Sequence, residues 1–272
     1  MKKALIGLAN NITPNFEKVK LWALSFKKHS DADVILLCAN STAEEIKSCK
    51  DLGIIPVSVS LDTPGEINHK RIKHIRDFIS TSDLDLFLST DVYDVAFQGD
   101  PFLKMDTNTY DIFVSGEGLL VKHEIWNGDN INKLFPKEIE KCRDNEIINS
   151  GIIAGKREPL VKLYDRMYDL CENHATNKHN IKDQAALIVM IANKEVEKIK
   201  IFNLNDGWAM HCAVSGPTHF FTAWGFVNNM LYGVPEMQGG YVISKFGKKY
   251  DIVHQFNRVP EWHEIIKRGN NL

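Results

Sequence analysis

The stretch ADVILLCA, residues 32–39, decides how the first third of the chain folds. It is almost continuously apolar, which is typical of a strand that is covered on both faces. Similar runs lie on either side of it, at Lys3–Ala9 and Ile54–Val59. We therefore expect three strands in the first sixty residues.

Helical patterns separate these strands. Apolar residues recur at helical spacing over Pro14–Lys28, and Ser41-Thr42-Ala43-Glu44 reads as a capping box before a helix that ends near Gly53. The order strand, helix, strand, helix, strand with short loops predicts a parallel sheet with right-handed crossovers. The predicted fold class is α/β, Rossmann-like, with a mostly parallel central sheet and helices on both faces.

Composition agrees with a globular protein. The chain has 272 residues, of which 44% are hydrophobic and 25% charged, enough for one large α/β domain or one domain with a C-terminal elaboration. The net charge of −2 argues against a nucleic-acid partner, which usually requires a basic excess. No repeat or linker divides the chain, so we expect a single domain over residues 1–272.

The cysteines and the lengths of the apolar runs indicate which cellular compartment to expect for the protein. The chain has five cysteines, an odd number without a CxxC pair, and we expect buried, reduced thiols in a reducing compartment, hence a cytoplasmic protein. They are Cys38, Cys49, Cys142, Cys171 and Cys212. No run approaches the ~18 apolar residues of a membrane span, so we expect no transmembrane segment.

Two carboxylates follow the fourth predicted strand, Leu84–Leu88. Asp91 and Asp94 stand in STDVYDVAFQGDPF, residues 89–102, with Tyr93 between them. Ligands of open α/β sheets bind at the carboxyl ends of the strands, where these residues would lie. The stretch could be a solvated loop with an Asp cap, but two neighbouring carboxylates repel unless a cation joins them. Oxygen ligands suit Mg²⁺ or Mn²⁺, which would neutralise a phosphate leaving group.

The later elements are less regular. We expect residues 119–146 to be irregular, whereas five other segments should form strands and helices. They are a strand at Asp111–Ser115 that ends in Gly116-Glu117-Gly118, an apolar segment at Ile147–Ala154, helices at Glu158–Glu172 and Asp183–Asn193, and a short strand in Tyr250–Arg258.

The stretch TDVYDVAF resembles the D-x-Y-D-V motif in the glycosyltransferase domain of collagen-modifying lysyl hydroxylases, within the GT-A superfamily. It is also similar to the D-x-x-D-V-x-F-Q-x-D-P-F pattern of many uncharacterised transferases. The resemblance implies that Asp91 and Asp94 bind the metal and that Tyr93 contacts the uridine nucleotide. It also implies a nucleotide-binding half to about residue 115 and an acceptor-side half from about residue 116.

Further matches follow in the same order over roughly residues 3–260. Ser115-Gly116-Glu117-Gly118 is similar to the family's A-E-G, Asn149-Ser150-Gly151 to its N-S-G, and Asp183-Gln184 to its D-Q. His254 matches a late histidine that supplies the third protein ligand to the metal. One departure is that Asp183 follows Lys182, where the family has a run of acidic residues.

Several donor contacts are expected from the same comparison. Ala9 and Asn10, at the end of the first strand, lie where such folds bind the base and ribose, mostly through backbone groups; Asn149 is assigned to the donor as well. The helix His69–Ser80 carries basic residues that either form a solvated face or let Arg71 or Lys73 reach the diphosphate.

Two carboxylates are candidates for the chemistry. Glu117 either sits in a turn between two glycines or lies near the sugar or acceptor. Asp183 either caps a helix or acts on the substrate. His211, His123 and Phe220–Phe226 either line an acceptor groove or are ordinary core and surface residues.

The expected activity is transfer of a sugar from a nucleotide donor, a UDP-sugar, to a hydroxyl of a glycan, lipid or protein, with Mn²⁺ or Mg²⁺ as cofactor. The resemblance is to retaining enzymes; an inverting enzyme would need Asp183 or Glu117 as base. Two alternatives stay open. One is a sugar nucleotidyltransferase, which normally shows a Gly-rich basic loop where this chain has ANNITPN, residues 9–15. The other is a non-catalytic nucleotide-sugar-binding module of the same fold.

Overall fold

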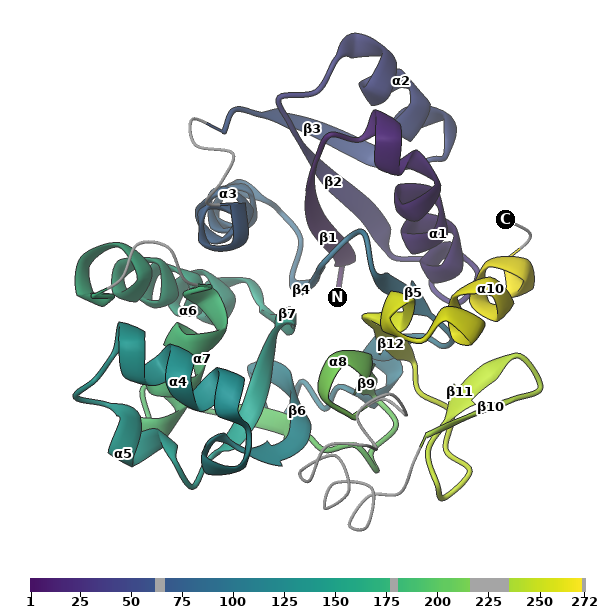
Figure 1. The fold of residues 1–272 in the computed structure, drawn as a ribbon. Coiled ribbons are helices and arrows are strands. Elements are labelled where there is room, and N and C mark those ends of the chain that lie inside the picture. Colours follow the sequence, from purple (N-terminus) through teal and green to yellow (C-terminus); the bar gives the residue numbers. More distant parts are fainter. Residues whose placement is uncertain (62–66, 177–180, 216–234, 271–272) are drawn as a thin grey trace.

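A seven-stranded mixed sheet forms the centre of the molecule (Figure 1). The computed structural model describes residues 1–61, 67–176, 181–215 and 235–270, and the architecture below refers to these. Across the sheet the strands are β3 (Ile55–Val59), β2 (Asp33–Ala39), β1 (Lys3–Asn10), β4 (Leu86–Thr90), β7 (Glu146–Lys156), β6 (Ile112–Leu120) and β8 (Ile199–Phe202).

The predicted, mostly parallel arrangement is confirmed. β1 pairs in parallel with β2 and β4, β2 with β3, and β6 with β8, whereas β7 runs antiparallel to both of its neighbours. The strand order turns at β1, because β2 and β3 lie on one side of it and β4 on the other. Such a point leaves a crevice at the carboxyl ends of the strands.

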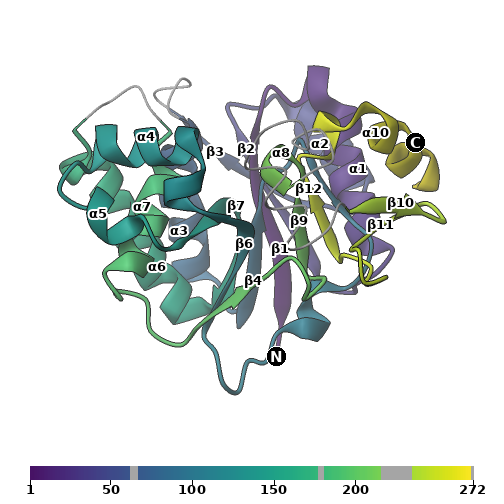
Figure 2. The same ribbon diagram turned by 60° about the horizontal axis from the view of Figure 1, so that its bottom comes forward.

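Helices cover both faces of this sheet, as Figure 2 shows. Successive side chains of β1 point to opposite faces of the sheet and therefore enter two different apolar cores. Ala4, Ile6 and Leu8 belong to one core, and Leu5 and Ala9 belong to the other. The helices on the Leu5 side are α1 (Phe16–Lys27) and α2 (Ala43–Asp51). Those on the Ile6 side are α3 (Ile67–Thr81), α4 (Ile125–Leu134), α5 (Ile139–Cys142), α6 (Arg157–Asp169) and α7 (Asp183–Ala192).

A small second sheet joins distant parts of the chain. Its order is β5 (Val95–Phe97), β12 (Ile252–His254) and β9 (Ala209–His211), so the C-terminal segment pairs directly with the residues after Asp94. A third apolar cluster packs this sheet against α10. The remaining elements are α8 (Cys212–Ser215), the hairpin β10 (Glu236–Gln238) and β11 (Tyr241–Ile243), α10 (Pro260–Gly269), the 3-10 turns Thr13–Asn15, Pro101–Lys104, Val121–His123 and Phe256–Arg258, and the π turn Leu170–His174.

Residues 119–146 correct the sequence prediction, since they contain α4 and α5 rather than irregular chain. The sequence of α4, IWNGDNINKL, is poor in strong helix formers. Tertiary packing compensates, because Ile131 and Leu134 are fully buried in the core, and the Glu124 carboxylate accepts the first backbone N–H groups. The capping box before α2 is also shifted by one residue: it consists of Thr42 and Glu45.

The glycines of Gly116-Glu117-Gly118 do not end their strand. β6 continues to Leu120 with irregular pairing to β7 around Gly116, and Glu117 is buried rather than exposed in a turn. A Cβ at Gly116 would stand 2.2 Å from the carboxylate of Glu146. The absence of a side chain at Gly116 therefore lets β6 run close to the Glu146 carboxylate, and the next residue, Glu117, lies in the protein interior.

Two simpler expectations concern thiols and membrane spans. All five cysteines are free and buried, as predicted. Among the described residues, helices that combine the length and apolar character needed to cross a bilayer are absent.

Candidate metal centre

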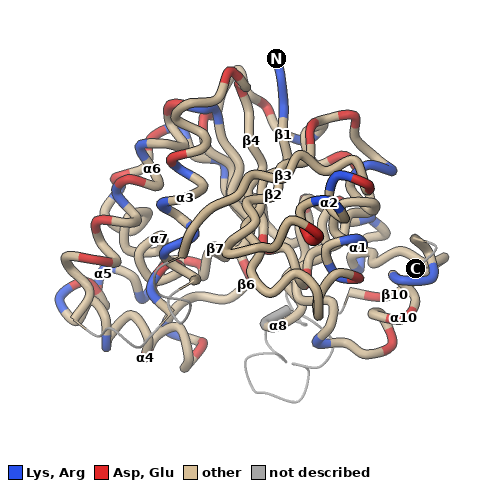
Figure 3. The backbone as a smooth tube through the Cα atoms, turned by 90° about the horizontal axis from the view of Figure 1, so that it is seen from above, with Lys and Arg blue, Asp and Glu red and all other residues tan. Residues whose placement is uncertain are grey.

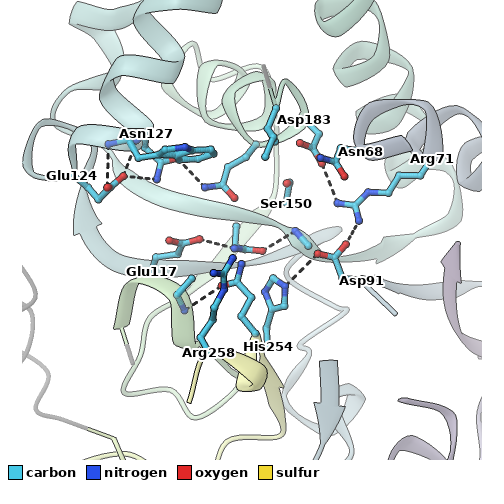
Figure 4. A pocket seen from close by; sticks show the side chains of 17 residues that line it. Asn68, Arg71, Asp91, Glu117, Glu124, Asn127, Ser150, Asp183, His254 and Arg258 are labelled. Atoms are coloured by element: carbon cyan, nitrogen blue, oxygen red, sulfur yellow. Dashed lines mark hydrogen bonds and ion pairs between the residues drawn. The ribbon is translucent and has the colours of Figure 1, made fainter. Parts of the chain in front are cut away.

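A cavity of about 700 Å³ lies beside the carboxyl end of β4. Its lining comes from elements spread over the chain: α3, the loop after β4, β6, β7, the start of α7 and the end of β12. Figure 4 shows the side chains that converge there, including Arg71, Asp91, Glu117, Asp183 and His254. Most of these groups are polar or charged, so the cavity suits a polar ligand.

Asp91, Asp94 and His254 come together at one end of this cavity. One ligand atom from each lies within 4.8 Å of the others. His254 Nε2 is 3.2 Å from Asp91 Oδ2 and 3.7 Å from Asp94 Oδ1. The predicted convergence of these three side chains is therefore confirmed.

Backbone pairing fixes these positions. His254 stands opposite Val95 in the β12–β5 ladder, and the N–H of Gln255 donates to the carbonyl of Asp94 at 2.7 Å. On the other side, the N–H of Asp91 donates to the carbonyl of Gly151 at 2.9 Å. The three side chains thus meet because two ladders hold their backbones together.

Gly151 makes room for the cluster. A Cβ at this position would lie 2.6 Å from His254 Cε1 and 2.7 Å from Asp91 Oδ2, closer than side chains approach one another. Its place in Asn149-Ser150-Gly151 therefore has a physical reason, which is close approach of strand β7 to the carboxylate and the imidazole.

The donor set fits a hard divalent cation. Neighbouring ligands at metal–ligand distances of roughly 2.0–2.3 Å stand about 3 Å apart, near the observed separations. His254 is 1% exposed, yet its Nε2 makes no hydrogen bond to any residue that the structure describes. Two carboxylates and an imidazole suit Mn²⁺ or Mg²⁺. The group could hold such an ion.

Burial keeps the imidazole available as a ligand. Desolvation lowers the pKa of His254, and the charges of Asp94 and Glu117 only partly oppose this effect. The neutral ring is therefore favoured at neutral pH, and a neutral ring has a lone pair to offer.

Arg71 enters the site, and Lys73 does not. Lys and Arg predominate along α3, whereas α6 carries both basic and acidic residues (Figure 3), and Lys73 pairs with Asp77 at 2.8 Å on the outside of α3. The guanidinium of Arg71 points into the cavity, where it contacts Asp91 and lies 3.0 Å from Asp183 Oδ2. The assignment of Lys73 to the donor is thus not supported, because helical periodicity directs its side chain away from the cavity.

Glu117 and Asn149 form a buried pair. Asn149 Nδ2 donates to Glu117 Oε1 at 2.5 Å, and Asn149 Oδ1 accepts from the N–H of Gly151 at 2.7 Å. Burial raises the pKa of Glu117 to about 7, against the lowering effects of Asn149 and His254. Asn149 therefore links the carboxyl group to the glycine beside the metal cluster.

Asp183 begins α7 as its first helical residue; the helix cap is Lys182. The Asp183 side chain is 2% exposed, and its Oδ1 has no hydrogen-bond partner among the described residues, whereas Oδ2 receives the Arg71 contact. The carboxylate therefore keeps one oxygen for a ligand in the cavity that it lines.

Further lining residues were missed by the sequence analysis. Gln184 Nε2 donates to Asn127 Oδ1 at 2.8 Å, and Asn127 Nδ2 donates to Glu124 Oε2 at 2.8 Å. Trp126 lies beside them with 48% of its surface exposed. Trp126 and Asn127 belong to α4, which was not predicted, and Glu124 caps that helix; only Gln184, in α7, stood in a quoted motif.

The proposed base-binding residues lie together but outside this lining. The hydroxyl of Tyr93 donates to the carbonyl of Asn10, and Lys18 Nζ stands 5.8 Å from the centre of the tyrosine ring. Ala9 is fully buried in the core, so its side chain is unavailable to a ligand. Tyr93 and Asn10 therefore meet at the carboxyl end of β1.

The remaining candidates have separate outcomes. His211 is fully buried and contacts His254 instead of lining a groove. His123 lies in the turn before α4, apart from the lining of the cavity. Phe220–Phe226 lies outside the described residues.

Comparison with known families and curated proteins gives no match: no family model fits the chain, and a search of curated proteins finds no similar sequence. Any functional interpretation therefore depends on the geometry of the cavity.

Proposed function

We propose that the protein is a metal-dependent glycosyltransferase with a GT-A fold, which moves a sugar from a UDP-sugar to a hydroxyl acceptor. The observation that carries this proposal is the convergence of Asp91, Asp94 and His254 beside a polar cavity at the carboxyl end of β4. The Rossmann-like sheet order around β1 supports a nucleotide site at the same edge.

Asp91, Asp94 and His254 would hold Mn²⁺ or Mg²⁺. The ion would supply positive charge to the diphosphate that leaves with the nucleotide. Arg71 lies next to Asp91 and offers further donors to phosphate oxygens. On the other side of the cluster, Tyr93 and Asn10 would contact the base.

Asp183 is the group we place against the sugar. Arg71 holds one of its oxygens, and the other remains open to the cavity. A carboxylate paired to a guanidinium is better suited to stabilising positive charge on the transferring sugar than to taking a proton from the acceptor. Sugar transfer builds such oxocarbenium-like charge, and a carboxylate that is poorly suited to act as the base favours retention over inversion.

Glu117 serves as support in this scheme. Its carboxyl group is buried and accepts from Asn149, which in turn accepts from the N–H of Gly151, and its raised pKa reflects that burial. Together with Asn149 it keeps β7 close to the metal cluster while the substrate occupies the cavity.

The proposal is tested by thermal unfolding with UDP, UDP-sugars and other nucleotides, each with and without Mn²⁺. A ligand that binds only the folded state raises the melting temperature, and we expect UDP compounds to do so only when the metal is present. Stabilisation by a sugar phosphate with a nucleoside triphosphate would instead indicate a nucleotidyltransferase. UDP binding without hydrolysis or transfer of any UDP-sugar would indicate a non-catalytic binding module.

A further inference from the structure

A second, fully buried histidine stands behind the metal cluster. His211 Nδ1 lies 3.0 Å from His254 Nδ1, and His211 Nε2 lies 2.9 Å from the hydroxyl oxygen of Ser115. His211 is 0% exposed and Ser115 1%, so the line from Ser115 through His211 to His254 is closed to solvent.

We infer that His211 is a positioning residue for the metal centre: it accepts the Nδ1 proton of His254 and thereby holds the Nε2 lone pair of His254 toward Asp91 and Asp94. Ser115 fixes His211 in turn. This inference rests on the metal site of the proposed function and adds to it the groups that select the binding-competent form of the imidazole.

Strand register produces the contact. His211 ends β9 and His254 ends β12, and the two residues stand opposite each other in the parallel β9–β12 ladder. Opposite residues of neighbouring strands project to the same face, so the rings meet edge to face with centroids 5.3 Å apart. Ser115 comes from β6, which packs against β9. The assembly therefore depends on three strands and not on a flexible loop.

The neighbouring groups allow the line of hydrogen bonds to run in the direction that metal binding requires. Two Nδ1 atoms at 3.0 Å must share one proton, so one ring donates and the other accepts. The hydroxyl of Ser115 can donate to the carbonyl of Gly116, 3.5 Å away, which leaves its oxygen to accept from His211 Nε2–H. His211 Nδ1 is then without a proton and accepts from His254 Nδ1–H.

The opposite direction would prevent metal binding through this ring. It would put the proton of His254 on Nε2, the atom that lies 3.2 Å from Asp91 and 3.7 Å from Asp94. A metal-binding histidine usually donates its other N–H to a fixed acceptor, which sets the tautomer and the ring orientation. Here the acceptor is a second imidazole, and the structure offers it at a buried position where water would not replace it.

The decisive measurement is Mn²⁺ affinity, determined by electron paramagnetic resonance of free Mn²⁺, with and without saturating UDP. His211→Leu replaces the imidazole with an apolar side chain of similar bulk and so removes the acceptor, and we expect about 10- to 100-fold weaker binding. His211→Asn puts an oxygen at the place of Nδ1 and should keep most of the affinity. Ser115→Ala should give a smaller loss than His211→Leu. Ser244→Ala, at another buried serine, whose hydroxyl accepts from the N–H of Lys248, should give none.

A second readout tests the tautomer directly. In protein saturated with Mg²⁺, long-range proton–nitrogen correlation spectra should place the ring proton of His254 on Nδ1 and that of His211 on Nε2. A proton on His254 Nε2 in that state would overturn the inference.

The outcomes separate this inference from the proposed function. If the wild-type protein does not bind Mn²⁺, or if His254→Ala binds it equally well, the metal site and the proposed function fail together. If His254→Ala loses affinity but His211→Leu does not, only the role of His211 fails. Thermal unfolding of each variant checks folding; should His211→Leu not fold, equal affinity of Ser115→Ala and Ser244→Ala would overturn the inference.

Discussion

Two walls of the cavity hold their side chains in different ways. The triad wall, made of Asp91, Asp94, Gly151 and His254, is fixed by backbone ladders and by the missing Cβ of its glycine. The helical wall, made of Trp126, Asn127, Asp183 and Gln184, is fixed by hydrogen bonds between side chains, such as that from Gln184 to Asn127.

Under the proposed function, this difference separates two tasks. Ligands of a small ion must keep their positions to a few tenths of an ångström, and strand pairing provides that. A wall that receives sugars benefits from amides, carboxylates and a partly exposed indole that can adjust to a ligand. Changes to the triad wall should therefore abolish one defined step, whereas changes to the helical wall should have graded effects.

The largest effect is expected for Asp94→Ala. Loss of one of the two carboxylates should remove Mn²⁺ binding and reduce transfer from a UDP-sugar by about 1,000-fold or more, since a bound metal contributes several kcal/mol to the barrier. Exposed Asp83, changed to Asn, is the control and should have no effect. Transfer that remains dependent on Mn²⁺ in Asp94→Ala would contradict the assignment of the triad wall.

The next largest effect is expected from Glu117, and it concerns how the free energy of unfolding depends on pH. Its pKa is about 7 in the folded protein and 4.5 ordinarily, so between these values the folded protein holds a proton that the unfolded chain has lost. Its contribution to stability is complete below pH 4.5 and is lost as the pH rises to about 7. At 1.36 kcal/mol per pKa unit, the loss is about 3 kcal/mol.

Glu117→Gln removes this titration. The difference in free energy of unfolding between variant and wild type should change by about 3 kcal/mol from pH 4.5 to pH 7.5, measured by urea unfolding without added metal. Two stability curves that stay parallel over this range would show that Glu117 titrates normally.

Asp183→Asn tests the helical wall at its most buried point. The amide keeps the shape and can still accept from Arg71, but it lacks the charge that we place against the sugar. We expect transfer to fall about 100-fold, within the usual range for a group that acts on the reacting atoms, with unchanged Mn²⁺ and UDP binding. Full activity would leave Asp183 with a structural role only.

The sequence predicted the first three strands and the helices between them because each is defined by its own pattern of apolar residues. Asp91, Asp94 and His254 were identified by resemblance, and their convergence needed only that the C-terminal strand return to this edge. The rest depended on contacts that no local pattern encodes. Helix α4 exists through the burial of Ile131 and Leu134, and His211 acquires its role only through the β9–β12 register.

Gly151→Ala tests the space in the triad wall. The new methyl group would meet His254 and Asp91 at less than 3 Å, so the strand or the ligands must shift, and overpacking of this kind costs about 1–3 kcal/mol of stability. Mn²⁺ affinity should fall with it. Gly269→Ala is the matched control, because a Cβ there meets open space. Equal stability and equal Mn²⁺ affinity in the two variants would show that the backbone of the triad wall can shift enough to accept an extra methyl group.

Trp126→Ala changes the helical wall instead of the triad wall and should have the smallest effect on the stability of the fold. The indole is 48% exposed, and its removal should change the free energy of unfolding by no more than about 0.5 kcal/mol, as for other surface positions. Trp208→Ala makes the same change at a fully buried site and should cost about 3–5 kcal/mol. Binding of Mn²⁺ and UDP should be unchanged in Trp126→Ala, because the triad wall lies across the cavity.

The acceptor is what Trp126 should affect. Its indole face is bordered by the amides of Asn127 and Gln184, and an aromatic face next to hydrogen-bonding groups suits a sugar ring with its apolar and polar sides. Hydrolysis of the UDP-sugar by water should therefore proceed at the wild-type rate in Trp126→Ala, while transfer to an added acceptor shows a higher KM. A loss of hydrolysis equal to the loss of transfer would mean that Trp126 supports the donor instead, and the division between the two walls would be wrong.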